Sequence, residues 1–223
     1  MGLSRKPTTI LHLHIFARFY PDDIIDDNGA NITGQITVLN EDVELPTITP
    51  PEWLESLFSG GTIEEDTTIS TSGKYSSINL GNNETVIISG DVTLYITGDI
   101  TLGNSAELQI EENSSLTLYL GGNLEQKNSS AINNGTQNPQ KLTIYGLEDC
   151  VEMLFKNGSD FYGTIYAPNA DIVMHNSTDM YGSVVAKNFE QKNSSTFYYD
   201  AFLREASADD EAVYFIITNW HEE

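Results

Sequence analysis

Three aspartates in the C-terminal third of the chain have the residue type and spacing to hold a cation. Asp160 and Asp179 occupy the same position in two copies of a short phrase, and Asp171 lies between them. If the copies stack, the first two carboxylates come within about 5 Å, where like charges repel unless a proton or a cation intervenes. Calcium prefers oxygen ligands of this kind. Calcium at Asp160, Asp171 and Asp179 is therefore one hypothesis, and solvated turn residues are the alternative.

The same phrases carry tyrosines that could bind a ligand. Tyr162, Tyr181 and Tyr198 each follow an apolar residue, and Tyr166 lies further along the first copy. Adjacent residues of a strand point to opposite sides, so either the apolar column or the tyrosine column faces outward. An exposed aromatic stripe binds glycans or partner proteins. The alternative, that one tyrosine column simply belongs to the core, is equally open.

The residues that catalysis would need are weakly represented. A polysaccharide lyase or hydrolase would use paired carboxylates, and a lyase would also need a base near Asp160 and Asp179, where the sequence offers Lys156, Lys187 and Lys192 beside turn residues. His12 and His14 could share one face of a strand but have no third metal ligand nearby. The single cysteine, Cys150, is interpreted as a small buried residue. We expect no enzyme and no cofactor apart from the calcium hypothesis.

The elements that position these residues are repeats. The phrase begins at Lys156, His175 and Lys192, so its copies are 19 and 17 residues apart, and residues 91–100 are echoed by residues 115–124. Alternating strand residues followed by Gly and Asn turns at this period predict a solenoid. At about 20 residues per coil, residues 73–200 give roughly six coils. We predict an all-β fold, a right-handed parallel β-helix.

Asparagine recurs at one register of the predicted coils. In a stacked coil identical residues lie above one another, and an amide both donates and accepts hydrogen bonds, so asparagines can bond along a column. Asn and Gly also tolerate the left-handed conformation that coil corners need. The predicted structural column consists of Asn104, Asn128, Asn157, Asn176 and Asn193.

The flanks of the repeats differ from them. Residues 1–60 are expected to form an irregular segment, with a strand over 29–38 and a short helix over 50–58 that caps the open end of the solenoid through Trp53, Leu54, Leu57 and Phe58. Residues 61–200 are expected to form the β-solenoid. Residues 201–223 are expected to form a strand over 213–218, packed on the stack because a free apolar edge would aggregate, and a tail.

The charge balance limits the partners. The chain has 33 acidic and 10 basic residues and a net charge of −23. Binding nucleic acid requires clustered Lys and Arg, so nucleic acid is not an expected partner. No apolar run approaches the roughly 18 residues of a membrane span, and the run over residues 8–16 is a poor signal-peptide core, so no export route is visible. The acidic surface is compatible with a salt-rich habitat and with divalent cations.

Two phrases together carry a family resemblance. Residues 162–170 (Tyr-Gly-Thr-Ile-Tyr-Ala-Pro-Asn-Ala) are followed by residues 181–187, by Tyr199-Asp200 and by Trp220-His221-Glu222. This resembles the β-helical C-terminal domain of unknown function in bacterial proteins of type IV pilus assembly, including PilX-like minor pilus components, and in related surface proteins. The resemblance covers residues 73–222. It implies an extracellular or cell-surface location in a bacterium, pilus proteins, cell-surface proteins or glycans as partners, and no catalytic residues.

The sequence therefore favours a non-enzymatic extracellular β-solenoid module, associated with a pilus or with the cell surface, that has an adhesive or structural role. The alternative is a calcium-dependent carbohydrate-binding or carbohydrate-active β-helix protein. The sequence does not identify the ligand.

Overall fold

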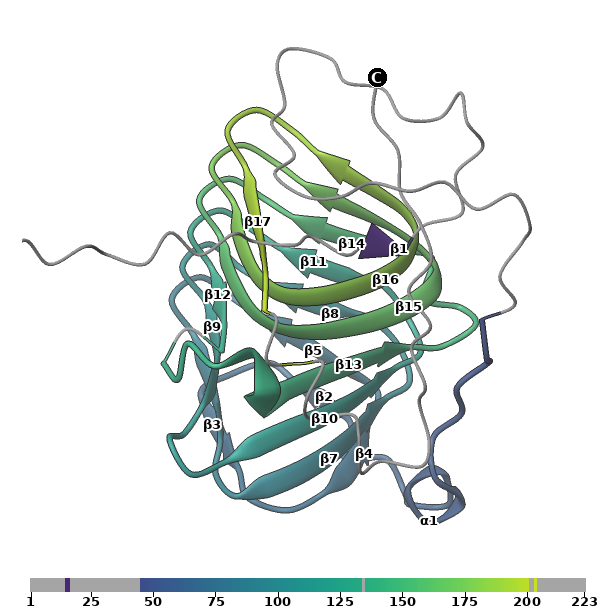
Figure 1. The fold of residues 1–223 in the computed structure, drawn as a ribbon. Coiled ribbons are helices and arrows are strands. Elements are labelled where there is room, and N and C mark those ends of the chain that lie inside the picture. The colour runs from purple at the N-terminus through teal and green to yellow at the C-terminus, as the bar shows by residue number, and fades with distance from the viewer. Residues whose placement is uncertain (1–14, 17–44, 134, 201–202, 204–223) are drawn as a thin grey trace, which may run out of the picture.

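The structure, a computed structural model, describes residues 15–16, 45–133, 135–200 and 203 of the 223-residue chain. The described part is a parallel β-solenoid of about six turns with very little helix (Figure 1). This confirms the predicted β-helix, whereas its right-handedness stays a prediction. The strands from β2 to β17 lie between Thr62 and Tyr199.

In the described part of the chain, seventeen strands form one continuous sheet that winds around three faces. Face A contains β2 (Thr62–Ile63), β5 (Ser77–Leu80), β8 (Ile100–Leu102), β11 (Leu124–Gln126), β14 (Glu152–Phe155) and the ends of β15 and β16. Face B contains β3 (Thr67–Ile69), β6 (Thr85–Ile88), β9 (Glu107–Ile110), β12 (Ala131–Ile132), the starts of β15 (Asp160–Met174) and β16 (Asp179–Gln191), and β17 (Thr196–Tyr199). Face C contains β4 (Gly73–Tyr75), β7 (Asp91–Ile96), β10 (Ser115–Leu120), β13 (Leu142–Gly146), the middle of β15 and β16, and β1 (Ile15–Phe16).

The core lies inside the coils and consists of apolar columns. Strands such as β7 and β10 bury every second residue, because successive side chains of a strand point to opposite faces. The inward residues of successive coils are in register, and each lies over its equivalent. One fully buried column runs along face C through Leu94, Leu118, Ile144, Ile165 and Val184. A second column, also in the core, runs along face B through Phe161, Met180 and Phe197.

The predicted cap is smaller than expected. The helix α1 covers only Glu52–Glu55 and packs against β4 and β7 of face C. Four residues make about one turn, so one side chain faces the sheet. Leu54 is fully buried, whereas Trp53 and Leu57 are exposed and Phe58 is completely exposed. The prediction that four apolar residues cap the stack is therefore wrong for three of them. Lys74 Nζ also holds the helix, donating to the Glu55 carbonyl at 2.7 Å.

Two segments that precede the solenoid in sequence lie on face C. The strand β1 pairs with β16, Ile15 beside Val184 and Phe16 beside Val185. Residues 45–51, which we call the strap, lead into α1, and the Pro46 carbonyl accepts a hydrogen bond of 2.7 Å from the Tyr166 hydroxyl. The sequence did not indicate either contact.

Several predicted elements fall on residues that the structure does not describe. These are the strand over 29–38, the pair His12 and His14, and the C-terminal strand over 213–218. Within the described ranges, no helix has the length and apolar character needed to cross a membrane.

Candidate functional site

The tyrosine stack on face B is the most regular outward feature of the last coils. The strands β15, β16 and β17 place Tyr162, Tyr181 and Tyr198 in register. The residues that precede these tyrosines, Phe161, Met180 and Phe197, are buried. Because successive side chains of a strand point to opposite sides, each tyrosine faces outward. Neighbouring ring centroids are 4.5 Å apart in both pairs, and the ring planes differ by only 2° and 7°.

This geometry determines which parts of the rings a ligand can reach. Both faces of the Tyr181 ring are covered by its neighbours, so Tyr181 presents its ring edge and phenol group rather than a flat aromatic face. Burial, with the charge of Asp179 as a second cause, raises the pKa of Tyr181 to about 12. The same two causes, burial and nearby carboxylates, raise the pKa of Tyr162. Both phenols therefore stay protonated near neutral pH and can donate hydrogen bonds along the edge of the stack.

An acidic pair lies in the strand positions beside the stack. Asp160 and Asp179 are in register at the starts of β15 and β16, two residues before Tyr162 and Tyr181. Residues two apart in a strand share a face, so the carboxylates and the phenols lie on the same outward side. Burial and then the charge of Asp179 raise the pKa of Asp160. The pair therefore repels itself, as expected from the sequence.

Asp171 does not belong to this pair. It starts the face A part of β15, where it is in register with Glu152 and Asn188. Asn188 Nδ2 donates to Asp171 Oδ1 at 2.6 Å, and Lys187 Nζ lies 3.9 Å from the same oxygen. The predicted grouping of three aspartates is wrong, because the chain passes onto a different face between Asp160 and Asp171, eleven positions later. In the ranges that the structure describes, no three His, Cys, Asp or Glu side chains group to hold a metal.

Tyr166 is also placed differently from the prediction. It is only 2% exposed, since it lies on face C beneath the strap and donates to the Pro46 carbonyl. It ends a second column of tyrosines, on the outer side of face C, whose members are in register: Tyr95, Tyr119, Tyr145 and Tyr166. The rings of Tyr119 and Tyr145 stack at 5.2 Å, whereas those of Tyr145 and Tyr166 meet edge to face at 6.4 Å. A binding role for an exposed Tyr166 is therefore wrong.

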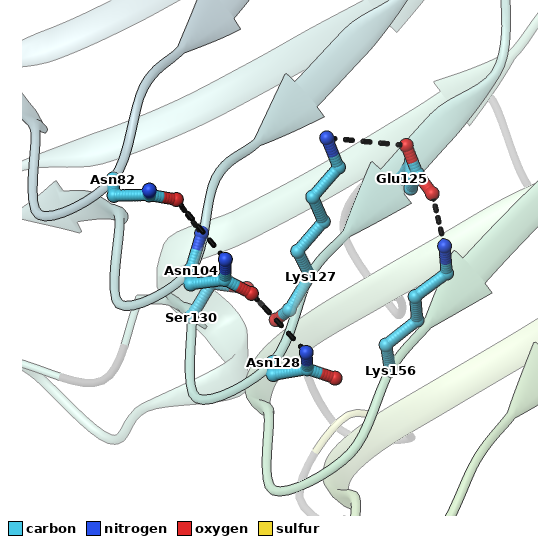
Figure 2. Close-up of polar contacts among 7 residues, drawn as sticks. All are labelled: Asn82, Asn104, Glu125, Lys127, Asn128, Ser130 and Lys156. Atoms are coloured by element: carbon cyan, nitrogen blue, oxygen red, sulfur yellow. Dashed lines mark hydrogen bonds and ion pairs between the residues drawn. The ribbon is translucent and has the colours of Figure 1, made fainter.

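An asparagine ladder runs along the corner between faces A and B (Figure 2). Asn104 Nδ2 donates to Asn82 Oδ1 at 3.1 Å, Asn128 Nδ2 to Asn104 Oδ1 at 3.2 Å, and Asn157 Nδ2 to Asn128 Oδ1 at 3.1 Å. Asn82 also accepts from the Asn104 backbone N–H at 2.9 Å.

The last two predicted members join the ladder through their backbone. The Asn176 carbonyl accepts from Gly158 N at 3.0 Å, and the Asn193 carbonyl accepts from Ser177 N at 3.3 Å. The predicted column omitted Asn82, which is the first member of the ladder. The pair Gly81-Asn82 repeats the pair Gly103-Asn104, so the sequence pattern could have identified it. The corner is therefore one continuous hydrogen-bonded column.

The left-handed residue of each corner is the one after the ladder asparagine. Its φ lies between 56° and 66° in six coils, at Asn83, Ser105, Ser129, Gly158, Ser177 and Ser194. The expectation that the column asparagine itself adopts this conformation holds only for Asn193, with φ 32°. Four serines therefore accept a conformation that L-residues disfavour, and stacking of the corners compensates for its cost.

Comparison with known proteins gives a family but no activity. Residues 23–206 match the family model described as a domain of unknown function, DUF7305. The chain belongs to the DUF7305 family. No curated protein and no solved structure matches it. The resemblance to a β-helical domain of unknown function is thus supported, and the link to pili is not part of the family description.

Several lysines of this DUF7305 domain pair with carboxylates other than Asp160 and Asp179. Lys127 and Lys156 both approach Glu125, which bridges two successive coils beside the ladder (Figure 2). Lys192 lies 3.2 Å from Glu190. The lysines that a lyase would have used beside Asp160 and Asp179 therefore have other carboxylate partners.

Two further residues of the DUF7305 domain have structural roles. Cys150 is fully buried, as predicted, and burial with the charge of Asp99 raises the pKa of its thiol to about 12. Asn133 is fully buried at the start of the loop that leads to the helix η1 (Pro139–Lys141). Its Nδ2 donates to the carbonyls of Asn138 and Tyr162, both at 2.9 Å. Asn133 thus fixes this loop to the first strand of the tyrosine stack, and no repeat signalled it.

Proposed function

We propose that this DUF7305 domain is a non-enzymatic, extracellular module of a bacterial cell surface or pilus, with a structural or adhesive role. The observation that carries the proposal is the tyrosine stack. The rings of Tyr162, Tyr181 and Tyr198 stack face to face across three coils, with neighbouring ring centroids 4.5 Å apart. Outward side chains that join coils in this way, together with the asparagine ladder, are expected of a stiff rod that presents a repetitive surface.

The adhesive element of the proposal is the outward row of face B. The protonated phenols of Tyr162 and Tyr181 can donate hydrogen bonds to a partner, and the neighbouring carboxylates of Asp160 and Asp179 can accept hydrogen bonds from it. A partner that fits this row offers alternating hydroxyl donors and acceptors along one line. A glycan chain has this chemistry, and so does a polar strip of a pilus or cell-surface protein.

A glycan array, probed with the purified domain with and without calcium, tests the adhesive role. We expect retention of a glycan that is reduced at least about tenfold by Asp179→Asn, since one lost charged hydrogen bond is worth about 1.5–3 kcal/mol. Glu112→Gln, an exposed acid outside face B, is the matched control. Equal loss in both variants would contradict a face B site, and release of glycan fragments would contradict a non-enzymatic role.

Cell fractionation tests the location. Cells that produce the protein from its own gene are treated with protease before lysis, and the domain is detected by antibody. We expect the protein in the surface fraction, degraded by external protease while a cytoplasmic marker stays intact. Detection only after lysis, together with the marker, would refute the surface assignment.

A second candidate function rests on the repulsion within the acidic pair. Asp160 has a raised pKa partly because Asp179 lies in register beside it, and a divalent cation would relieve this repulsion. A calcium-dependent carbohydrate-binding role would then use the same row of face B. Calorimetric titration with calcium, followed by thermal melting, decides this candidate. An absence of heat together with an unchanged Tm at millimolar calcium would eliminate it.

A further inference from the structure

The last coil of the solenoid is completed by a strand from outside the repeats. From β2 to β17, the strands follow one another in sequence from coil to coil. The exception is β1, which pairs in parallel with β16 at Val184 and Val185 and supplies the face C strand of the last coil. In Figure 1, β1 lies beside β16 at the end of the stack away from α1.

The residue types of β1 match the columns that it joins. Ile15 takes the register position that follows Ile165 and Val184, both of which are buried. Phe16 takes the position that follows Tyr166 and Val185, within the column that carries the face C tyrosines. The register therefore places an apolar residue and an aromatic residue where the solenoid has the same kinds, which is what a specific strand site requires.

The edge of β16 exists independently of its occupant. β16 is held by β15 through twelve register pairs, from Asp160–Asp179 to Met174–Gln191. The pairing with β1 comprises only two residues. An edge strand whose N–H and C=O groups lack a neighbour is a template for a strand of another chain. A short occupant of a well-formed edge can be replaced at little cost.

The length of chain between β1 and the strap lets β1 reach beyond its own solenoid. Residues 17–44 span about 90 Å when fully extended, whereas seven stacked strands rise about 30 Å. We propose that the edge of β16 at Val184–Val185 is a strand-acceptor site, and that β1 of a second copy of the chain can occupy it in exchange for its own. This goes beyond the proposed function and does not rest on it.

The balance between the two occupants depends on protein density. A strand that is covalently tethered near its site has an effective concentration in the millimolar range. In dilute solution each chain therefore fills its own site, and at millimolar local density the β1 of a neighbour competes on equal terms. Such densities arise where copies are arrayed side by side, and exchange would then link them.

The acceptor site is tested with a chain that lacks residues 1–20 and a labelled peptide of residues 8–20. We expect one peptide to bind per chain, measured by fluorescence anisotropy, and to raise Tm. If the truncated chain does not fold alone, the peptide should restore its far-ultraviolet β-sheet signal. A peptide with Ile15→Pro and Phe16→Pro is the matched control, expected to bind at least about tenfold more weakly because proline has no N–H to donate.

Three outcomes would overturn the proposal. The first is a folded truncated chain that does not bind the peptide, and the second is an unfolded one that the peptide does not rescue. The third is preferential binding of a peptide of residues 211–220, which would assign the edge to the C-terminal apolar segment instead.

The second copy is tested by sedimentation of the truncated chain mixed with tagged full-length chain. At millimolar concentration we expect about half of the truncated chain in a 1:1 complex, following the millimolar effective concentration of a tethered strand. Full-length chain carrying Ile15→Pro and Phe16→Pro should form no complex. Peptide binding without any complex between the two chains would refute exchange between copies.

Discussion

Removal of one amide from the middle of the asparagine ladder should weaken the joint between three coils. We develop this expectation for Asn128→Ala. Asn128 Nδ2 donates to Asn104 at 3.2 Å (Figure 2), and Asn128 Oδ1 accepts from Asn157 at 3.1 Å. The backbone carbonyl of Asn128, which accepts from Ser105 N, is retained in the variant. The substitution therefore isolates the side-chain bonds.

The magnitude follows from the number of bonds and from their exposure. A protein hydrogen bond contributes about 0.5–1.5 kcal/mol net, and the lower value applies to Asn128 because its side chain is exposed. Two such bonds amount to about 1 kcal/mol. For a chain of 223 residues, this loss lowers Tm by about 2–4 °C. Asn157→Ala, which removes only the donated bond to Asn128, should lose about half as much.

The assay is thermal and urea unfolding followed by circular dichroism. Asn113→Ala is the matched control, since Asn113 is an exposed turn residue of the same solenoid that lies outside the ladder. We expect Asn128→Ala to lower the unfolding midpoint more than Asn113→Ala does, without a change in the slope against urea. If the two variants lose the same stability, the ladder bonds add nothing to the turn preference of asparagine, and the reasoning is refuted.

Three further expectations concern the corners and face B. Gly182→Ala should cost about 3 kcal/mol, because Gly182 has φ +143° and an added Cβ would overlap the Gly163 carbonyl, whereas Gly135→Ala should be nearly neutral in urea unfolding. Ser105→Gly should gain about 0.5 kcal/mol, because φ 57° is strained for an L-residue; a loss would contradict this. The pKa of Tyr181 is raised from 10.0 to about 12, so its contribution to stability is complete below pH 10 and is lost as the pH rises through 12. In thermal melts at alkaline pH, Tyr181→Phe should therefore show a smaller fall of Tm with pH than the unchanged protein.

The solenoid was predictable because residues of the same type recur in the sequence at intervals of about one coil. Stacked parallel strands place equivalent residues over one another, so Leu94, Leu118 and Ile144 recur at intervals set by the coil. The asparagine ladder was predictable for the same reason. The outward orientation of Tyr162 followed from its neighbour Phe161 once that neighbour was assigned to the core.

The positions of Asp171, Tyr166 and β1 depended on contacts that produce no repeating pattern in the sequence. Asp171 lies away from Asp160 because two corners separate them, and the corners within a long strand such as β15 are not marked by a Gly-Asn turn. Tyr166 was buried by the strap, a segment 120 residues away in sequence. The pairing of β1 with β16 involves two residues, too few to form a recognisable pattern.

The position of β1 makes the two ends of the solenoid different from each other. Both Phe16 and Tyr199 lie in the last coil, since β1 and β17 each pair with β16. The described chain thus enters and leaves at one end, while α1 lies at the other (Figure 1). A domain joined through residue 15 or residue 200 would therefore lie beside the last coil. The first coil would then be the part of the solenoid farthest from that domain.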